Sequence, residues 1–302
     1  MKFDVFQETR VGARPYNQDR LGHWSTGDAL LMVLADGMGG HLNGEIAAQL
    51  AVEAVASAFR TDARPKLANP DLFIFRAIGH AHTRILEQAV KLGLPETPRT
   101  TIVVCVVQEG FAYWGHVGDS RLYLIRNGRI VTRTRDHTRV QQLIDNGRIR
   151  EEAAATHPDR NKLLQCLGSD APPKLEPTAT ARLARNDILL LCSDGLWGPL
   201  TQRQLLHAYM TAELPRATRD LMTLAETRSG PQCDNVSALA MCWGEDEIPA
   251  AESPRTLPYD ELPTDVQDFT ATDPDFLRMS DAEIDRAIEE IRAALKKNQA
   301  LK

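Results

Sequence analysis

The stretch Ala29-Leu-Leu-Met-Val-Leu-Ala-Asp36-Gly37 is a strand-like apolar run that stops at an aspartate and a glycine. Three further aspartates stand where an apolar run meets a turn: Asp119 in Gly118-Asp119-Ser120, Asp194 in Ser193-Asp194-Gly195 and Asp234 in Cys233-Asp234-Asn235. Carboxylates at strand ends can gather around a hard cation such as Mg²⁺ or Mn²⁺, and flanking glycines let backbone carbonyls and waters reach it. The sequence therefore predicts a metal-dependent hydrolase.

Length and composition indicate one sizeable domain with an appended segment. The chain has 302 residues, 43% of them hydrophobic, which is ordinary for a chain that buries a full core. No apolar run reaches the ~18 residues of a membrane span, and the N-terminus lacks a basic-then-apolar signal. We therefore expect no membrane insertion and a cytoplasmic location.

Charge and cysteine usage argue against nucleic-acid binding and against zinc or redox cysteine sites. The net charge is −6 and the basic residues are scattered, so we expect no nucleic-acid binding. The five cysteines form no Cys-x-x-Cys pair, and Cys105, Cys192 and Cys242 lie within apolar runs. Buried, reduced thiols are therefore expected in place of zinc or redox sites.

Apolar periodicity predicts a layered α+β fold, in which largely antiparallel sheets pack together with helices outside. Asn127-Gly128 between two apolar runs is typical of a two-residue hairpin, and the strands are not each followed by a helix, as parallel units would require. The expected strands are 29–35, 102–107, 111–117, 121–126, 188–192 and 236–243. The expected helices are 45–59, 72–92, 140–146, 202–210 and 218–227.

The composition changes after residue 244. Residues 245–279 hold ten acidic residues, two basic ones and five prolines, which predicts an extended linker. A capping box at Ser280 and Glu283 then predicts a C-terminal amphipathic helix over 280–302. Its narrow apolar seam consists of Ile284, Ile288, Ile291 and Leu295. Such a helix must dock on residues 1–244, bind a partner or self-associate.

Five ordered motifs resemble the bacterial branch of the protein phosphatase 2C (PPM) family, over about residues 1 to 243. They are Arg14-Pro-Tyr-Asn-Gln-Asp19, Ala35-Asp36-Gly37-Met38-Gly39-Gly40, Gly115-His-Val-Gly-Asp119-Ser-Arg121, Cys192-Ser-Asp194-Gly195-Leu-Trp and Asp234-Asn235. The resemblance implies a catalytic domain over 1–244, built as a four-layer α-β-β-α sandwich of two antiparallel sheets flanked by helices. It also implies a phosphoserine/phosphothreonine protein phosphatase.

The same resemblance implies a site for two Mn²⁺ or Mg²⁺ ions with a possible third. Asp36 would bridge two ions, with the Gly37 carbonyl completing one of them. Asp194 and Asp234 would hold the other ion, and Asp119 together with Asp194 would hold the third. Asp19 would act mainly through water, because Gln18 stands where animal relatives carry a carboxylate.

Arg14 is the expected catalytic and substrate-binding clamp, since a guanidinium can grip two phosphate oxygens. A water or hydroxide activated by the metals would attack phosphorus directly, without a phosphoenzyme. Animal relatives carry a histidine, as the supposed general acid, at the position of Met38. His41 is the candidate replacement, and a surface or capping role is its plainer alternative.

The expected partners are a phosphorylated Ser/Thr protein and its cognate kinase. A catalytically silent metal-binding regulatory module and a hydrolase of small phosphoesters are the alternatives. Residues 135–168 resemble the mobile flap of bacterial relatives, which would influence which phosphoprotein fits. The motifs around Asp19 and Asp36 also look like those of phosphatases paired with kinases that control bacterial type VI secretion.

Overall fold

The computed structural model describes residues 1–38, 43–176 and 178–244 of the chain. Its strands form two five-stranded antiparallel sheets, ordered β1-β10-β9-β6-β7 and β2-β3-β4-β5-β8. The strands are β1 Phe3–Arg10, β2 Asp19–Ser25, β3 Ala29–Asp36, β4 Ile102–Gln108, β5 Phe111–Val117, β6 Arg121–Arg126, β7 Arg129–Arg133, β8 Ala179–Arg182, β9 Ile188–Cys192 and β10 Val236–Trp243. The expected antiparallel α+β architecture is confirmed.

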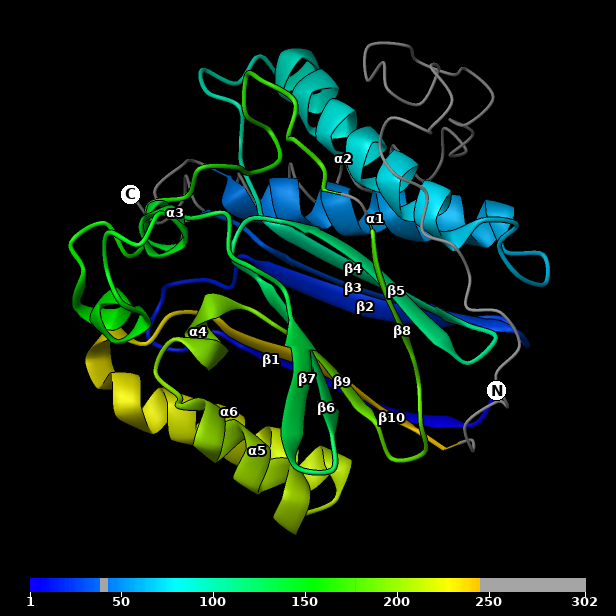
Figure 1. Ribbon diagram of the computed structural model, residues 1–302. Coiled ribbons are helices and arrows are strands. Elements are labelled where there is room, and N and C mark those ends of the chain that lie inside the picture. Colours follow the sequence, from blue (N-terminus) through cyan, green and yellow to red (C-terminus); the bar gives the residue numbers. More distant parts are fainter. Residues whose placement is uncertain (39–42, 177, 245–302) are drawn as a thin grey trace.

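Helices cover the outer face of each sheet, which gives the four layers α-β-β-α (Figure 1). The helices are α1 Gly44–Asp62, α2 Pro70–Leu92, α3 Arg139–Asp145, α4 Asp194–Trp197, α5 Gln202–Thr211 and α6 Leu214–Ser229. Helices α1 and α2 pack on the β2–β5 side, whereas α5 and α6 pack on the sheet that contains β9 and β10. Two short 3₁₀ turns, Glu151–Thr156 and Gly230–Gln232, complete the described part.

Strand β3 shows why an unbroken apolar run can be a strand. Leu31 and Val33 face the layer of α1 and α2, while Leu30, Met32 and Leu34 face the opposite sheet. Both faces are therefore buried, so the usual polar half of the alternation is missing. The inner sheet face, the α1/α2 layer and the α4–α6 layer each form a separate apolar cluster.

The sandwich brings several chain turns to one end. Asp19 and Asp36 are direct partners across β2 and β3. Asp119 precedes β6, Asp194 follows β9 and Asp234 precedes β10, and these three strands are neighbours in the other sheet. Helices α3 and α4 lie at this end, and the N-terminus lies at the opposite end (Figure 1).

The expected strands from 29 onward lie within one residue of β3 to β6, β9 and β10, and the hairpin turn is present with φ of 49° at Asn127 and 68° at Gly128. The pattern predicted no ranges for β1, β2, β8 and α4. All five cysteines are unpaired, and Cys242 is only partly buried. The expected linker and C-terminal helix lie outside the described residues. Within the described part, no helix is long and apolar enough to cross a membrane.

Candidate active site

Aspartates from separate strand ends lie close enough to shift one another's pKa. The pKa of Asp36 is raised well above its ordinary value, first by burial and then by the charges of Asp19, Asp194, Asp119 and Asp234. Burial and like charges also raise the pKa of Asp194 to about 7, and burial raises that of Asp19 to about 6. The structure therefore brings together all five carboxylates that the sequence selected.

Such a cluster is unfavourable without positive charge, because buried carboxylates repel each other and lose hydration. An all-oxygen donor set suits Mg²⁺ or Mn²⁺. Asp19 Oδ1 is buried and has no hydrogen-bond partner among the described residues, which leaves an oxygen available to an ion or its water. In the described part, no three acidic, His or Cys side chains form a ready-made metal cage. Mg²⁺ commonly keeps several waters in protein sites.

Two glycines allow the turns of the cluster to approach other backbone closely. A Cβ on Gly37 would lie 2.4 Å from the carbonyl oxygen of Gly44, and one on Gly195 would lie 2.1 Å from that of Asn235. Neither position has room for a side chain. The Asp-Gly pairs at 36–37 and 194–195 therefore reflect packing at the site as well as turn propensity.

Threonines at the start of β4 hold Asp36 in place. The amide of Asp36 donates to Thr101 Oγ1 at 3.1 Å, and Thr100 Oγ1 donates to the Asp36 carbonyl at 2.9 Å. Thr101 Oγ1 also lies 2.7 Å from Ser120 Oγ, beside Asp119. No motif in the sequence points to these threonines. Their position just before an apolar strand was the only local signal.

Serine and asparagine side chains support the other aspartates. Ser193 Oγ donates to Asp19 Oδ2 at 2.8 Å and accepts from the Ser237 amide at 3.1 Å. The Gln18 amide donates to Asn235 Oδ1 at 2.8 Å, and Asn235 Nδ2 donates to the carbonyl of Val11 at 2.8 Å. These bonds tie the N-terminal segment to the turn that carries Asp234.

Arg14 lies at the edge of the cluster. Its Nη2 is 2.6 Å from Asp234 Oδ2, and its side chain is half exposed. The hydrogen bond to Asp234 is the largest influence on the Arg14 pKa, which is raised, and the charges of Asp194 and Asp36 contribute as well. An exposed guanidinium beside the carboxylates is well placed to meet a phosphoryl group.

The general acid has no candidate histidine in the described part of this site. His41 lies outside the described residues, so its proposed role stays a prediction. Met38 is held by a bond from its amide to the Arg99 carbonyl at 3.0 Å. None of the described residues that line the groove beside the aspartates is a histidine.

That groove has a volume of about 440 Å³ and extends from Asp194 and Asp234 into the region of the expected flap. Its flap wall includes Val140 and Ile144, and its opposite wall is formed by α4 and the residues that follow it. Apolar and polar groups both line it, so it can accept a polypeptide segment next to the carboxylates.

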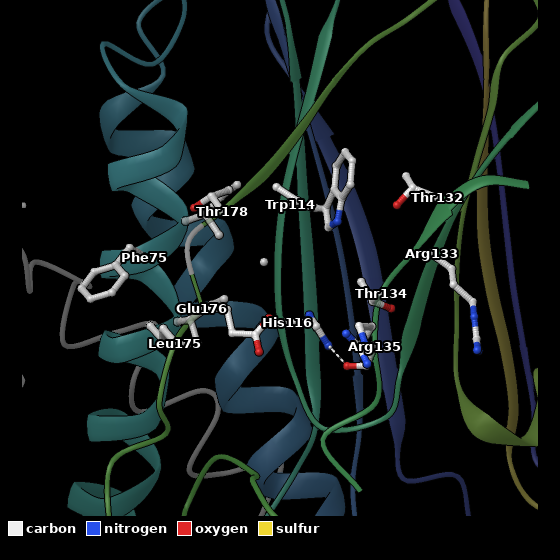
Figure 2. Close-up of a pocket in the computed structure, with 14 residues that line it drawn as sticks. Phe75, Trp114, His116, Thr132, Arg133, Thr134, Arg135, Leu175, Glu176 and Thr178 are labelled. Atoms are coloured by element: carbon white, nitrogen blue, oxygen red, sulfur yellow. Dashed lines mark hydrogen bonds between the residues drawn. The ribbon is translucent and has the colours of Figure 1, made fainter. Parts of the chain in front are cut away.

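Figure 2 shows a second, smaller cavity of about 140 Å³, located between α2, β5, the end of β7 and the segments 175–176 and 178–179. None of the five aspartates lines it. His116 lies in its wall, with Nε2 2.7 Å from the Arg135 carbonyl. The ring of His116 stacks on that of His137, with centroids 4.5 Å apart. The chemistry of the aspartate cluster is therefore separate from this cavity.

Comparisons with known proteins agree with the fold and the motifs. The protein phosphatase 2C family model matches residues 11–227. The serine/threonine protein phosphatase PstP of Mycobacterium tuberculosis is 39% identical over 215 residues, which are 70% of this chain and 40% of PstP. The chain thus spans less than half the length of PstP. A putative protein phosphatase 2C-type protein of Streptococcus pyogenes is 30% identical over 82% of this chain and 97% of its own length.

Solved structures give the same assignment. The catalytic domain of PstP in complex with two manganese ions is 30% identical, with a TM-score of 0.68 over 80% of this chain and 99% of that one. PppA, described as a key regulatory component of the type VI secretion system in Pseudomonas aeruginosa, is 27% identical. Its TM-score is 0.64 over 80% of this chain and 98% of PppA. Together with the family match, these similarities show that the chain belongs to the protein phosphatase 2C family.

Proposed function

We propose that the chain is an Mn²⁺- or Mg²⁺-dependent phosphoserine/phosphothreonine protein phosphatase that opposes a Ser/Thr kinase. The observation that carries the proposal is the convergence of Asp19, Asp36, Asp119, Asp194 and Asp234 beside Arg14. The five free cysteines support a reducing compartment such as the cytoplasm.

In this proposal, Asp36, Asp194 and Asp234 hold two cations with help from the Gly37 carbonyl. Asp119 and Asp194 share a third, and Asp19 acts through water. Bound divalent cations would supply an activated water and neutralise charge on the phosphoryl oxygens. The roles of the chain's own residues are to fix the carboxylates and to orient the phosphate.

Arg14 would orient the phosphate by exchanging partners. Its guanidinium now donates to Asp234, and a phosphoryl group at the same edge would compete for the same donors. Once Asp234 is engaged by a cation, the guanidinium is free to grip phosphate oxygens. Arg14 thus belongs to substrate binding and charge stabilisation, and it does not act as a proton donor.

The groove favours a phosphoprotein over a small phosphoester. A phosphate alone would need only the carboxylate cluster and Arg14, whereas the groove continues for about 440 Å³ along the flap region. Arg160 lines it and has no ion-pair partner among the described residues. A guanidinium without a partner can read the residues that flank a phosphorylated side chain. The similarity to PppA supports including type VI secretion proteins among the candidates tested by phosphoproteomics.

The test is hydrolysis of para-nitrophenyl phosphate and of a phosphothreonine peptide. We expect activity with Mn²⁺ and loss of both activities in EDTA. Asp194→Asn should lower kcat/KM by more than about 100-fold, because the loss of a direct metal ligand should exceed the loss usual for indirect metal contacts. The matched control is Asp220→Asn, which changes an exposed carboxylate on α6. Unchanged turnover in EDTA would contradict metal dependence. A folded, Mn²⁺-binding but inactive protein would favour the silent module.

A further inference from the structure

The turn that carries Asp119 is held by residues remote in sequence. The indole Nε1 of Trp197 donates to the Asp119 carbonyl at 3.0 Å. His137 bonds both backbone groups of Gly118: its amide donates to the Gly118 carbonyl at 2.8 Å, and its Nδ1 accepts from the Gly118 amide at 3.2 Å. Gly118 has a φ of 105°, which restricts the turn to a conformation that suits glycine. The backbone around Asp119 is thus fixed on two sides.

Arg121 in turn fixes Trp197. Its guanidinium carbon lies 3.4 Å from the centroid of the Trp197 ring. The guanidinium also forms a bidentate ion pair with Asp136: Nε donates to Oδ1 at 2.8 Å and Nη2 to Oδ2 at 2.7 Å. Nη1 donates to the Tyr123 hydroxyl at 2.9 Å. Stacking and a two-pronged ion pair both require a flat, fixed guanidinium. We refer to Arg121, Asp136 and Trp197 as the Arg121 bracket.

The bracket connects the two aspartates assigned to the third cation. Trp197 and Asp194 are the last and first residues of the short helix α4, so the place of the indole depends on the helix that begins with Asp194. The other end of the connection is the Asp119 carbonyl. Trp197 therefore links the backbone of Asp119 to the helix that begins with Asp194.

We propose that Trp197, held flat by Arg121, positions Asp119 relative to Asp194 and thereby sets the affinity of the cation that they share. This inference rests on the proposed function, because it presumes the cation. Trp197 is a positioning residue in this scheme, since its indole contacts the backbone of Asp119 and not the carboxylate. All three bracket residues also line the groove, so a bound polypeptide would touch the residues that set the Asp119–Asp194 geometry.

Trp197→Phe tests the inference because it removes the N–H donor while keeping an aromatic ring, smaller than the indole, for Arg121. Isothermal calorimetry of the full chain with Mn²⁺ should show unchanged affinity for the tighter sites. The affinity of the weakest site should fall about tenfold, which is the usual loss when an indirect metal contact is removed. The Mn²⁺ activation curve should shift to higher concentration, with kcat recovering at saturating metal. Trp243→Phe is the control. Trp243 Nε1 is buried without a hydrogen-bond partner in the described part, so the same substitution removes no bond there.

A double-mutant cycle with Asp119→Asn separates positioning from general destabilisation. If Trp197 acts through Asp119, Trp197→Phe should cause no further shift in metal affinity once Asp119 has lost its charge. An equal shift in both backgrounds would overturn the inference, as would a Trp197→Phe titration identical to that of Trp243→Phe. A wild-type chain that binds Mn²⁺ but hydrolyses no phosphoester would contradict the proposed function, while the calorimetric comparison would still decide the role of Trp197.

Discussion

In the proposed function, Arg14 exchanges its ion pair with Asp234 for contacts with a phosphoryl group. It is paired with Asp234 in the structure, yet half of its side chain is open to solvent. An exposed ion pair of this kind contributes little to stability, because water screens both charges. Its placement is therefore better explained by substrate binding than by folding.

Replacing Arg14 tests this interpretation at the residue scale. Arg14→Ala should raise KM for a phosphothreonine peptide, with a smaller fall in kcat, and reduce kcat/KM about tenfold or more, the loss expected for a hydrogen bond to a charged group. Arg14→Lys should recover part of the loss, because it restores charge without the two-pronged geometry. Steady-state kinetics with Arg216→Ala as the surface control provides the measurement. A kcat/KM equal to that of the wild type would remove Arg14 from the site.

His82 links helix α2 to the chain segment that contains Gly168. The side chain is 3% exposed on α2, and its Nδ1 accepts a hydrogen bond from the Gly168 amide at 3.2 Å. Burial lowers the pKa of His82 below its ordinary value of 6.5. Protonation of Nδ1 would cost both this hydrogen bond and the favourable burial of the neutral ring.

The sign of the resulting pH dependence follows from that shift. The unfolded chain takes up a proton near pH 6.5 that the folded chain does not, so the contribution of His82 to stability is lost as pH falls below 6.5. His82→Asn keeps an acceptor near Nδ1 but cannot titrate. Urea unfolding of both proteins from pH 7.5 to 5 should show a smaller loss for the variant. Parallel curves would contradict the assignment.

Elements were predictable from sequence where both faces are buried. Strands β3 and β4 are continuous apolar runs in the middle of a sheet, so their residues alone indicate a buried strand. Strands β1, β2 and β8 are edges with half-exposed, polar positions, and they lack such a run. β7 is also an edge, but its hairpin turn revealed it. Edge strands depend on the sheet they join, which a local pattern does not contain.

The same distinction holds for the site. Its aspartates stand in local motifs, and the structure brings them together. Trp197 and His137 act through bonds to residues 78 and 19 positions away, so no local spacing pointed to their roles. Ser193 reaches Asp19 across 174 positions. Such supporting contacts are created by the packing of the sandwich and become visible only in three dimensions.

At the scale of the whole molecule, the described domain closes with β10. Its last strand pairs with β1 as far as Phe3 and Trp243, and the Gly244 amide donates to the Lys2 carbonyl at 2.9 Å. Every proposed metal ligand lies before that point. Between Asp234 and Gly244 lies β10, whose eight residues span roughly 26 Å as an extended strand.

Truncation after Gly244 should therefore leave hydrolysis of para-nitrophenyl phosphate within about twofold of the full chain, because it removes no proposed metal ligand and no residue of the described core. We expect weaker dephosphorylation of the physiological phosphoprotein, or a change in oligomeric state by light scattering, if residues 280–302 bind a partner or self-associate. Loss of small-substrate activity in a folded truncated protein would show instead that residues 245–302 support the active site.

The carboxylate cluster also has a consequence for the thermodynamics of the whole chain. Cations that bind the folded sandwich but not the unfolded chain stabilise it by about 2.7 kcal/mol each at a concentration of 100 times Kd. The repulsion among Asp19, Asp36, Asp119 and Asp194 would then be relieved only while metal is present. Through this linkage, the free concentration of divalent cation sets how much of the protein is folded and resistant to proteases, in addition to how fast it works.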